Sequence, residues 1–212
     1  MILLSIFQEL YDNVMASTWP EVVAVLTGLL SVWFAKKENI LVYPVGIVSV
    51  LIYVYLCLSV KLYADMSINA FYFVMSVYGW VKWSRKTGDK PSRPITRATR
   101  PEWIYSVAGV IAFFIILYFI LKNYTDSNVP FWDAITTAIF IIGMWLMALK
   151  KIENWVAWII GDLICIPLFA SKGLILSSFQ FTIFLILAVS GYLEWRKKVG
   201  HNSKFKIQNS KL

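Results

Sequence analysis

The sequence is poor in charge and in the residues that build metal centres, disulfide frameworks and catalytic sets. Only 15% of its 212 residues are charged, whereas a soluble domain keeps about a quarter. The two cysteines, Cys57 and Cys165, lie in separate apolar segments without a CxxC pattern, and the one histidine, His201, lies near the C-terminus. This set predicts buried thiols rather than a disulfide or a metal site.

Motifs for energy coupling and catalysis are also absent from the sequence. It has no GxxxxGK[ST] phosphate loop, no Ser/His/Asp arrangement, and no second acid deep in an apolar run to pair with Asp162. Coupling to ATP within this chain is therefore excluded, and a proton relay is poorly supported. We predict a protein that is not an enzyme and uses no cofactor.

Hydrophobic residues, in contrast, make up 59% of the sequence, and its mean hydropathy is +0.67. Apolar runs of roughly 17 to 22 residues recur along it, the length that crosses a hydrocarbon core about 30 Å thick. Strands of alternating polarity are missing, so helices must satisfy the backbone in lipid. The pattern predicts an all-α integral membrane protein in a lipid bilayer.

Seven membrane spans are predicted, preceded by an amphipathic helix over residues 1–18 that lies in the membrane interface. A polar, basic loop over residues 87–102 separates the third span from the fourth, and a polar basic tail without regular structure covers residues 199–212. The predicted spans are residues 20–36, 40–60, 64–83, 103–122, 133–149, 152–171 and 174–195.

The basic residues report membrane topology rather than nucleic-acid binding, although the formal net charge is +8. With seven spans, Lys61, Lys122 and Lys172 fall on the N-terminal side of the membrane, and the other 17 lysines and arginines fall on the opposite side. By the positive-inside rule, the N-terminus is outside and the C-terminus is cytoplasmic.

The end of the third span is repeated at the end of the seventh. Residues 79–86 read GWVKWSRK and residues 191–198 read GYLEWRKK, at an offset of 112 residues. Two three-helix units, residues 19–86 and 130–198, are therefore predicted, and the linker span 103–122 makes them parallel. Parallel repeats occur among small-molecule transporters, with the substrate between the halves, although a structural bundle would also fit.

The second helices of the two units match at a different offset, 115 residues. At this offset, isoleucines of the first unit stand where the second unit has Trp155 and Asp162. Binding chemistry is then concentrated in the second unit, as an asymmetric ligand requires. The matched pairs are Glu38-Asn39 with Glu153-Asn154, Tyr43 with Trp158, and Gly46 with Gly161.

Residues 152–162 form the strongest candidate binding site. Asn154, Trp158 and Asp162 recur at i, i+4 and i+8 and share one helical face, with Trp155 on its flank. Two indole faces suit a flat aromatic cation, and an amide suits a hydroxyl or amide of a ligand. An acid halfway along a span is costly and usually functional.

Each of these residues also has a purely structural interpretation. Trp155 fits an interfacial aromatic belt, and Trp158, which lies further into the span, fits it less well. Asn154 fits a helix cap, and Asp162 fits an interhelical hydrogen bond to a Ser or Thr.

Three polar residues on other spans are candidates for the same cavity. Asn69 and Tyr72 lie one turn apart in the third span, and Gln180 lies in the seventh. Each of them equally fits a hydrogen bond between helices.

The Glu-Asn-Trp-Val-Ala-Trp stretch before Gly161-Asp162, the two Gly-aromatic-x-x-Trp endings and the three-plus-one-plus-three plan resemble the PnuC family of vitamin transporters. The resemblance covers about residues 19–198 and implies a SWEET-like fold and homotrimers. It implies uptake of nicotinamide riboside across the bacterial inner membrane by facilitated diffusion, followed by phosphorylation by a separate cytoplasmic kinase.

The same resemblance implies that Asn154, Trp155 and Trp158 contact the ligand, whose pyridinium ring is a permanent cation. Thiamine, another flat cationic vitamin, would suit the same site. A non-transporting membrane receptor or scaffold would use the same spans but needs no polar face in the sixth. A central site requires that the sixth span begin before Ile152 or bend near Pro167.

Overall fold

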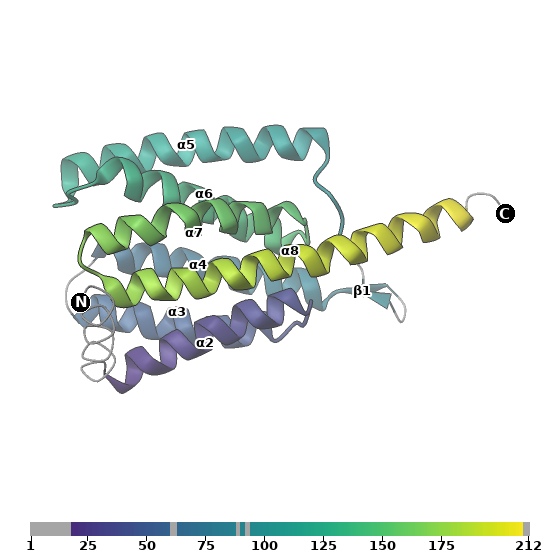
Figure 1. Cartoon of the computed structure of the whole chain (residues 1–212), viewed down its shortest axis with the longest axis horizontal. Coiled ribbons are helices and arrows are strands. Elements are labelled where there is room, and N and C mark those ends of the chain that lie inside the picture. Colours follow the sequence, from purple (N-terminus) through teal and green to yellow (C-terminus); the bar gives the residue numbers. More distant parts are fainter. Residues whose placement is uncertain (1–17, 60–62, 88–89, 92–93, 210–212) are drawn as a thin grey trace, which may run out of the picture.

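The structure, a computed structural model, describes residues 18–59, 63–87, 90–91 and 94–209. Within these residues, seven helices form a bundle, which confirms the predicted helical architecture (Figure 1). The predicted amphipathic helix over residues 1–18 lies outside the described residues, apart from Thr18. The helices are α2 (Trp19–Lys36), α3 (Val42–Ser59), α4 (Tyr63–Ser84), α5 (Arg100–Tyr124), α6 (Pro130–Ala148), α7 (Glu153–Ser171) and α8 (Ile175–Asn209).

Six of the helices, all except α4, are long and apolar enough to cross a membrane by length and composition. The 22 residues of α4 are long enough, but they include polar residues such as Asp65, Asn69 and Ser76. Apart from the end of α8, every helix begins and ends within three residues of a predicted span. Segment length and apolar composition therefore fixed these elements well.

The helices pack as two groups of three. We call α2, α3 and α4 the first trio, and α6, α7 and α8 the second trio; in each, the middle helix packs against both others. The trios meet where α2 lies against α8 and where α4 lies against α6. Helix α5 packs against α6 on the outside of the bundle (Figure 1) and buries less of itself than the other five candidate spans.

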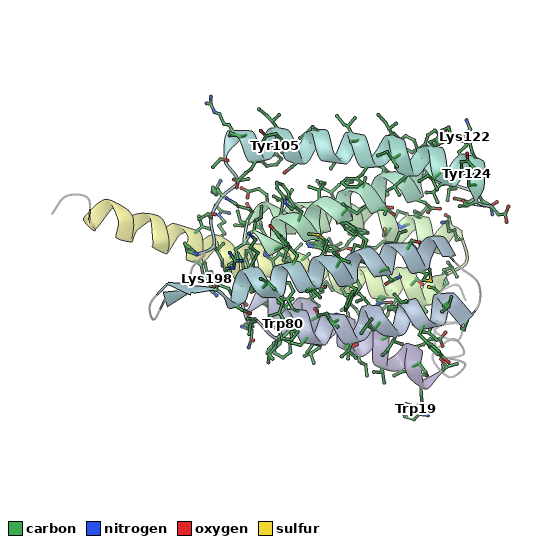
Figure 2. The ribbon with its side chains drawn as sticks, turned by 180° about the vertical axis from the view of Figure 1, so that it is seen from behind. Trp19, Trp80, Tyr105, Lys122, Tyr124 and Lys198 are labelled. Atoms are coloured by element: carbon green, nitrogen blue, oxygen red, sulfur yellow. The ribbon has the colours of Figure 1, made fainter. Side chains whose placement is uncertain are left out.

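The bundle has two distinct ends. Lys198 marks one of them, here called the basic end, and Lys122 marks the opposite end (Figure 2). The alternation of predicted spans likewise places these two lysines on opposite sides of the membrane. The short hairpin of β1 (Lys86–Thr87) and β2 (Lys90–Pro91) also lies at the basic end (Figure 1).

Helices α2 and α6 end at the basic end in the same way. The second residue after each helix has a left-handed backbone, Glu38 with φ 59° and Lys150 with φ 54°. The next N–H then bonds to the carbonyl five residues before it, at 2.9 Å in both cases. Glycine is the usual residue at this position of a helix end, and another residue costs about 1 kcal/mol there.

The loop after α4 packs against the second trio. Ile95 is buried, and Thr96 forms backbone hydrogen bonds to Lys150 and Ile152 at 3.1 and 3.0 Å. Further along, Thr99 caps α5, because its hydroxyl accepts from the Glu102 N–H at 3.5 Å, and its own N–H donates to the Glu102 carboxylate at 2.7 Å. The polar loop is thus attached to the turn between α6 and α7.

One expectation about helix ends is corrected. The prediction of a tail without regular structure is wrong as far as Asn209, because α8 continues to that residue. Residues 175–209 contain no proline to stop the helix, and Lys198 anchors its extension through an ion pair with Glu38 at 2.9 Å. Helix α7 begins at Glu153, so the span does not begin before Ile152, and Asn154 and Trp155 lie in its first turn.

Candidate functional site

Asn154 is fully buried at the start of α7 and does not cap the helix. The capping position is Ile152, and the Asn154 side chain donates from Nδ2 to the Lys151 carbonyl at 2.6 Å. Its other polar atom, Oδ1, is buried and has no hydrogen-bond partner among the described residues. A buried acceptor left in this state costs about 1–3 kcal/mol, so Asn154 presents an acceptor that a ligand could satisfy.

Trp155 is buried and therefore does not belong to an interfacial belt. Its ring is perpendicular to that of Trp195 on α8, with centroids 5.6 Å apart. The indole lies over Gly191, where any Cβ would overlap the ring. Its Nε1 donor is buried and unpaired within the part of the chain that the structure describes. Two consecutive residues of α7 thus carry an unpaired acceptor, Asn154 Oδ1, and an unpaired donor, Trp155 Nε1, among the described residues.

Trp158 lies one turn further along α7 and is half-buried. One face of its ring stacks on Phe140 of α6, with centroids 5.1 Å apart and planes within 25°. The small residue Gly143 on α6 leaves room for the indole. Because Phe140 covers one face, the other face of Trp158 is the one that a flat ligand could contact.

Asp162 is buried halfway along α7. Its Oδ2 atom has no hydrogen-bond partner in the described ranges, so a bond to a Ser or Thr does not account for that oxygen. One turn further on, the Cys165 thiol bonds to Thr136 of α6. The face that carries Asp162 is therefore directed into the bundle, where an unpaired polar oxygen is unfavourable without a ligand.

The three candidates on other helices differ in their surroundings. Tyr72 of α4 packs against the buried cluster that contains Trp155. Asn69 is half-buried one turn earlier on α4. Gln180 on α8 bonds to Tyr53 of α3, which favours its interpretation as a link between helices.

Two tryptophans that sequence reasoning treated only as repeat markers tie the trios together. Trp83 of α4 donates from Nε1 to the Met147 carbonyl of α6 at 3.3 Å, and Trp195 of α8 donates to the Ala35 carbonyl of α2 at 3.1 Å. The two donors are 112 residues apart in the sequence, and so are the two acceptors. The repeated Gly-aromatic-x-x-Trp endings were the signal that could have identified them.

The same offset relates other contacts and corrects the alignment of the second helices. Tyr43 packs perpendicular to Trp83, with centroids 5.2 Å apart, as Trp155 packs on Trp195. Tyr43 lies over Gly79 as Trp155 lies over Gly191. The offset of 115 residues, which aligned Tyr43 with Trp158, is therefore wrong in terms of packing: Tyr43 occupies the place of Trp155.

A cluster of charges joins the trios at the basic end. Glu38 pairs with Lys150 and with Lys198, both at 2.9 Å, and the Lys150 ammonium lies 4.5 Å from the ring centroid of Trp83. Burial by itself raises the pKa of the Glu38 carboxyl, but the hydrogen bonds and charges of the two lysines outweigh it, so the pKa lies below its ordinary value of 4.5. Glu194 adds ion pairs to Lys36 and Lys37 at 3.3 Å.

Known proteins resemble this chain over most of its length. Residues 18–197 match the family model described as nicotinamide mononucleotide transporter. The chain is 27% identical over 203 residues to the nicotinamide riboside transporter PnuC of Escherichia coli (strain K12), a match that covers 84% of this chain and 85% of that protein. It is 26% identical over 184 residues to the riboflavin/roseoflavin transporter RibM of Streptomyces davaonensis, a match that covers 84% of each.

A solved structure has the same fold. The crystal structure of the vitamin B3 transporter PnuC matches with a TM-score of 0.70 at 25% sequence identity. The match covers 94% of this chain and 90% of that one.

Proposed function

This chain belongs to the nicotinamide mononucleotide transporter family, and we propose that it carries nicotinamide riboside across a bacterial inner membrane by facilitated diffusion. The observation that carries the proposal is the buried polar and aromatic face of α7 in a chain whose relatives are named as transporters of vitamins with flat rings. A cytoplasmic kinase that phosphorylates the riboside would keep the imported substrate inside the cell.

The architecture that we propose is two parallel three-helix repeats joined by α5, with α4 as the seventh span. Its support is the set of contacts that recur at 112 residues, including the two indole hydrogen bonds between the trios. The N-terminus would then be outside and the C-terminus cytoplasmic, with the basic end facing the cytoplasm. Assembly into homotrimers belongs to the same proposal.

In the proposed site, the exposed face of Trp158 stacks on the pyridinium ring, and Asp162 supplies a negative charge for it. A cation over an aromatic face gains about 0.5–2 kcal/mol. Asn154 Oδ1 accepts a hydrogen bond from the carboxamide or the ribose, and Trp155 Nε1 donates a hydrogen bond to one of these groups. Tyr72 and Asn69 line the site from α4, whereas Gln180 links α8 to α3 through Tyr53.

Transport would follow from rocking of the two trios around this site. The indole hydrogen bonds and the Glu38 ion pairs join the trios at the basic end, so this structure corresponds to a state that is closed there. Opening toward the cytoplasm must break or rearrange these contacts.

Uptake of labelled nicotinamide riboside by proteoliposomes tests the substrate and the stacking role together. Trp158→Ala is expected to weaken uptake at low substrate by about 2- to 30-fold, the range that corresponds to a cation on an aromatic face. Trp132→Ala is the control, because Trp132 lies on α6 with 47% of its surface exposed. No uptake by the wild type removes the proposed substrate, and normal uptake by Trp158→Ala removes the stacking role.

A second candidate substrate is another flat vitamin, because a relative that is 26% identical is named as a riboflavin transporter. Thiamine, a flat cation, also suits the stacking site. Competition of riboflavin, thiamine and nicotinamide riboside in the same assay decides among them. A receptor that does not transport would bind a ligand without releasing it inside the vesicles.

A further inference from the structure

Tyr43 is a buried polar residue that the proposed site does not include. It lies in the first turn of α3, at the basic end, and only 1% of its surface is exposed. Its hydroxyl is enclosed and has no hydrogen-bond partner among the residues that the structure describes. A phenol buried in this way needs an explanation, because nearly all buried polar groups in native proteins are paired.

The position of Tyr43 matches that of Trp155 in the other trio. Each ring stands perpendicular to a tryptophan that joins the trios, Trp83 for Tyr43 and Trp195 for Trp155. Each ring also occupies space left by a glycine, at Gly79 and Gly191. The two aromatic side chains are therefore equivalent positions in the two halves of the bundle.

The polar atoms of these equivalent side chains are alike as well. The Trp155 indole nitrogen and the Tyr43 hydroxyl are both buried and both unpaired within the described part of the chain. Both rings belong to one contiguous buried cluster, which also includes Tyr72 and Trp158 at its margin. Two donors, one from each trio, thus belong to the same buried cluster.

Stability does not explain the hydroxyl of Tyr43. A phenylalanine would keep the ring on Trp83 and Gly79 and would remove an unpaired buried polar group, which is unfavourable. Sites that bind ligands commonly carry polar groups that are satisfied only when the ligand is present. The chemistry of Tyr43 fits such a group, since its hydroxyl can both donate and accept.

We infer that Tyr43 is a substrate-contacting and specificity-determining residue of the first trio, whose hydroxyl bonds to a ribose hydroxyl or to the carboxamide of the substrate. The inference rests on the proposed transport of nicotinamide riboside and adds the residue through which the first trio takes hold of the ligand. A ligand that bonds to Tyr43 from one trio and to α7 from the other would couple its binding to their relative position.

Binding and melting measurements on the purified protein in detergent test this role. Tyr43→Phe is expected to bind nicotinamide riboside about tenfold more weakly, as for the loss of one hydrogen bond. The melting temperature without ligand should stay the same or rise. Tyr55→Phe is the matched control, because Tyr55 lies on the same helix with 65% of its surface exposed, and it should change neither quantity.

Analogues identify the group that Tyr43 contacts. Ribosides that lack one hydroxyl, and one that lacks the carboxamide, are compared between wild type and Tyr43→Phe. The analogue that lacks the group contacted by Tyr43 should bind to the wild type and to Tyr43→Phe with equal affinity, because neither complex can form that hydrogen bond.

Three results would overturn the inference or separate it from the proposed function. Wild-type affinity in Tyr43→Phe means that the hydroxyl does not contact the substrate. Weaker binding together with a lower melting temperature without ligand means that Tyr43 only supports the structure. If the wild type does not bind nicotinamide riboside, the proposed function fails first, and this inference fails with it.

Discussion

Trp83 and Trp195 lie side by side between the two trios, with ring centroids 6.1 Å apart, and each donates its indole hydrogen to a helix-terminal carbonyl of the opposite trio. The carbonyls belong to the last turns of α6 and α2, where each also accepts the N–H of the residue three positions later, Lys150 for Met147 and Glu38 for Ala35, both at 2.9 Å. The two indoles therefore add a second donor at these buried helix ends and connect the trios.

Replacement of Trp195 by phenylalanine removes its hydrogen bonds to the Ala35 and Lys36 carbonyls, at 3.1 and 3.2 Å. The Ala35 carbonyl keeps the Glu38 N–H at 2.9 Å, whereas the Lys36 carbonyl loses the indole donor. We expect the free energy of unfolding to fall by about 1–3 kcal/mol, seen as a lower melting temperature in detergent. Trp80→Phe is the control, because Trp80 lies on α4 with 40% of its surface exposed. Equal melting of Trp195→Phe and the wild type would show that the hydrogen bond contributes nothing.

Glu38→Gln removes the charge that pairs with two lysines. Lys150 is left buried without its counterion, which costs about 3–5 kcal/mol for a buried pair. We expect a lower melting temperature at pH 7 and faster opening at the basic end, measured as labelling of an engineered cysteine there. Glu21→Gln, at the start of α2, is the control, because Glu21 lies far from the basic end.

The same carboxylate predicts a pH dependence of stability. The pKa of Glu38 in the folded protein lies below the ordinary value of 4.5 that applies to the unfolded chain. The stabilisation is therefore fully present above about pH 4.5 and is lost as the pH falls through the folded-state pKa. Melting curves between pH 7 and pH 3 should show this loss in the wild type and a smaller loss in Glu38→Gln.

Gly191→Ala tests the placement of Trp155. A methyl group at residue 191 would overlap the Trp155 ring and displace it. We expect weaker binding of nicotinamide riboside and slower uptake. Gly200→Ala on the same helix is the control, because the structure places no atom within 4 Å of a Cβ there. The idea fails if the two variants bind the substrate equally well.

Asp162→Asn keeps the shape of the side chain and removes its charge. Nicotinamide riboside carries a permanent positive charge on its ring, whereas its reduced form does not. If Asp162 balances that charge, the variant should lose about tenfold or more in affinity for the oxidised riboside and little for the reduced one. Competition of both forms in one binding assay measures the ratio, and an equal loss for both would contradict the electrostatic role.

Much of the candidate site was visible in the sequence. Asn154, Trp158 and Asp162 share a face because helical spacing is fixed, and the structure buries Asn154 and Asp162 with unpaired oxygens among the described residues. The contact of Gln180 with Tyr53 was less accessible, because it joins residues of α8 and α3 that are far apart in the sequence.

Tyr43 shows why the two halves of the sequence could be aligned correctly only with the tertiary structure. The similarity of Glu38-Asn39 to Glu153-Asn154 favoured an offset of 115 residues, but it compares residues at different positions in the turns. Packing on Trp83 and Gly79 places Tyr43 at the position that Trp155 has in the second trio. A short match of polar residues in the sequence does not identify which residues occupy equivalent positions in the two trios. The contacts between aromatic rings and glycines identify them.

The sequence by itself determined the number and extent of the apolar helices, the excess of basic residues at one end, and the polar face of α7. These properties depend on segment length, composition and spacing, which are local. The tertiary structure alone decided that Trp83 and Trp195 bond across the trios, that Glu38 and Lys150 pair, and that Tyr43 faces the same buried region as Trp155. Such contacts join residues more than 60 positions apart, so they depend on how the helices pack.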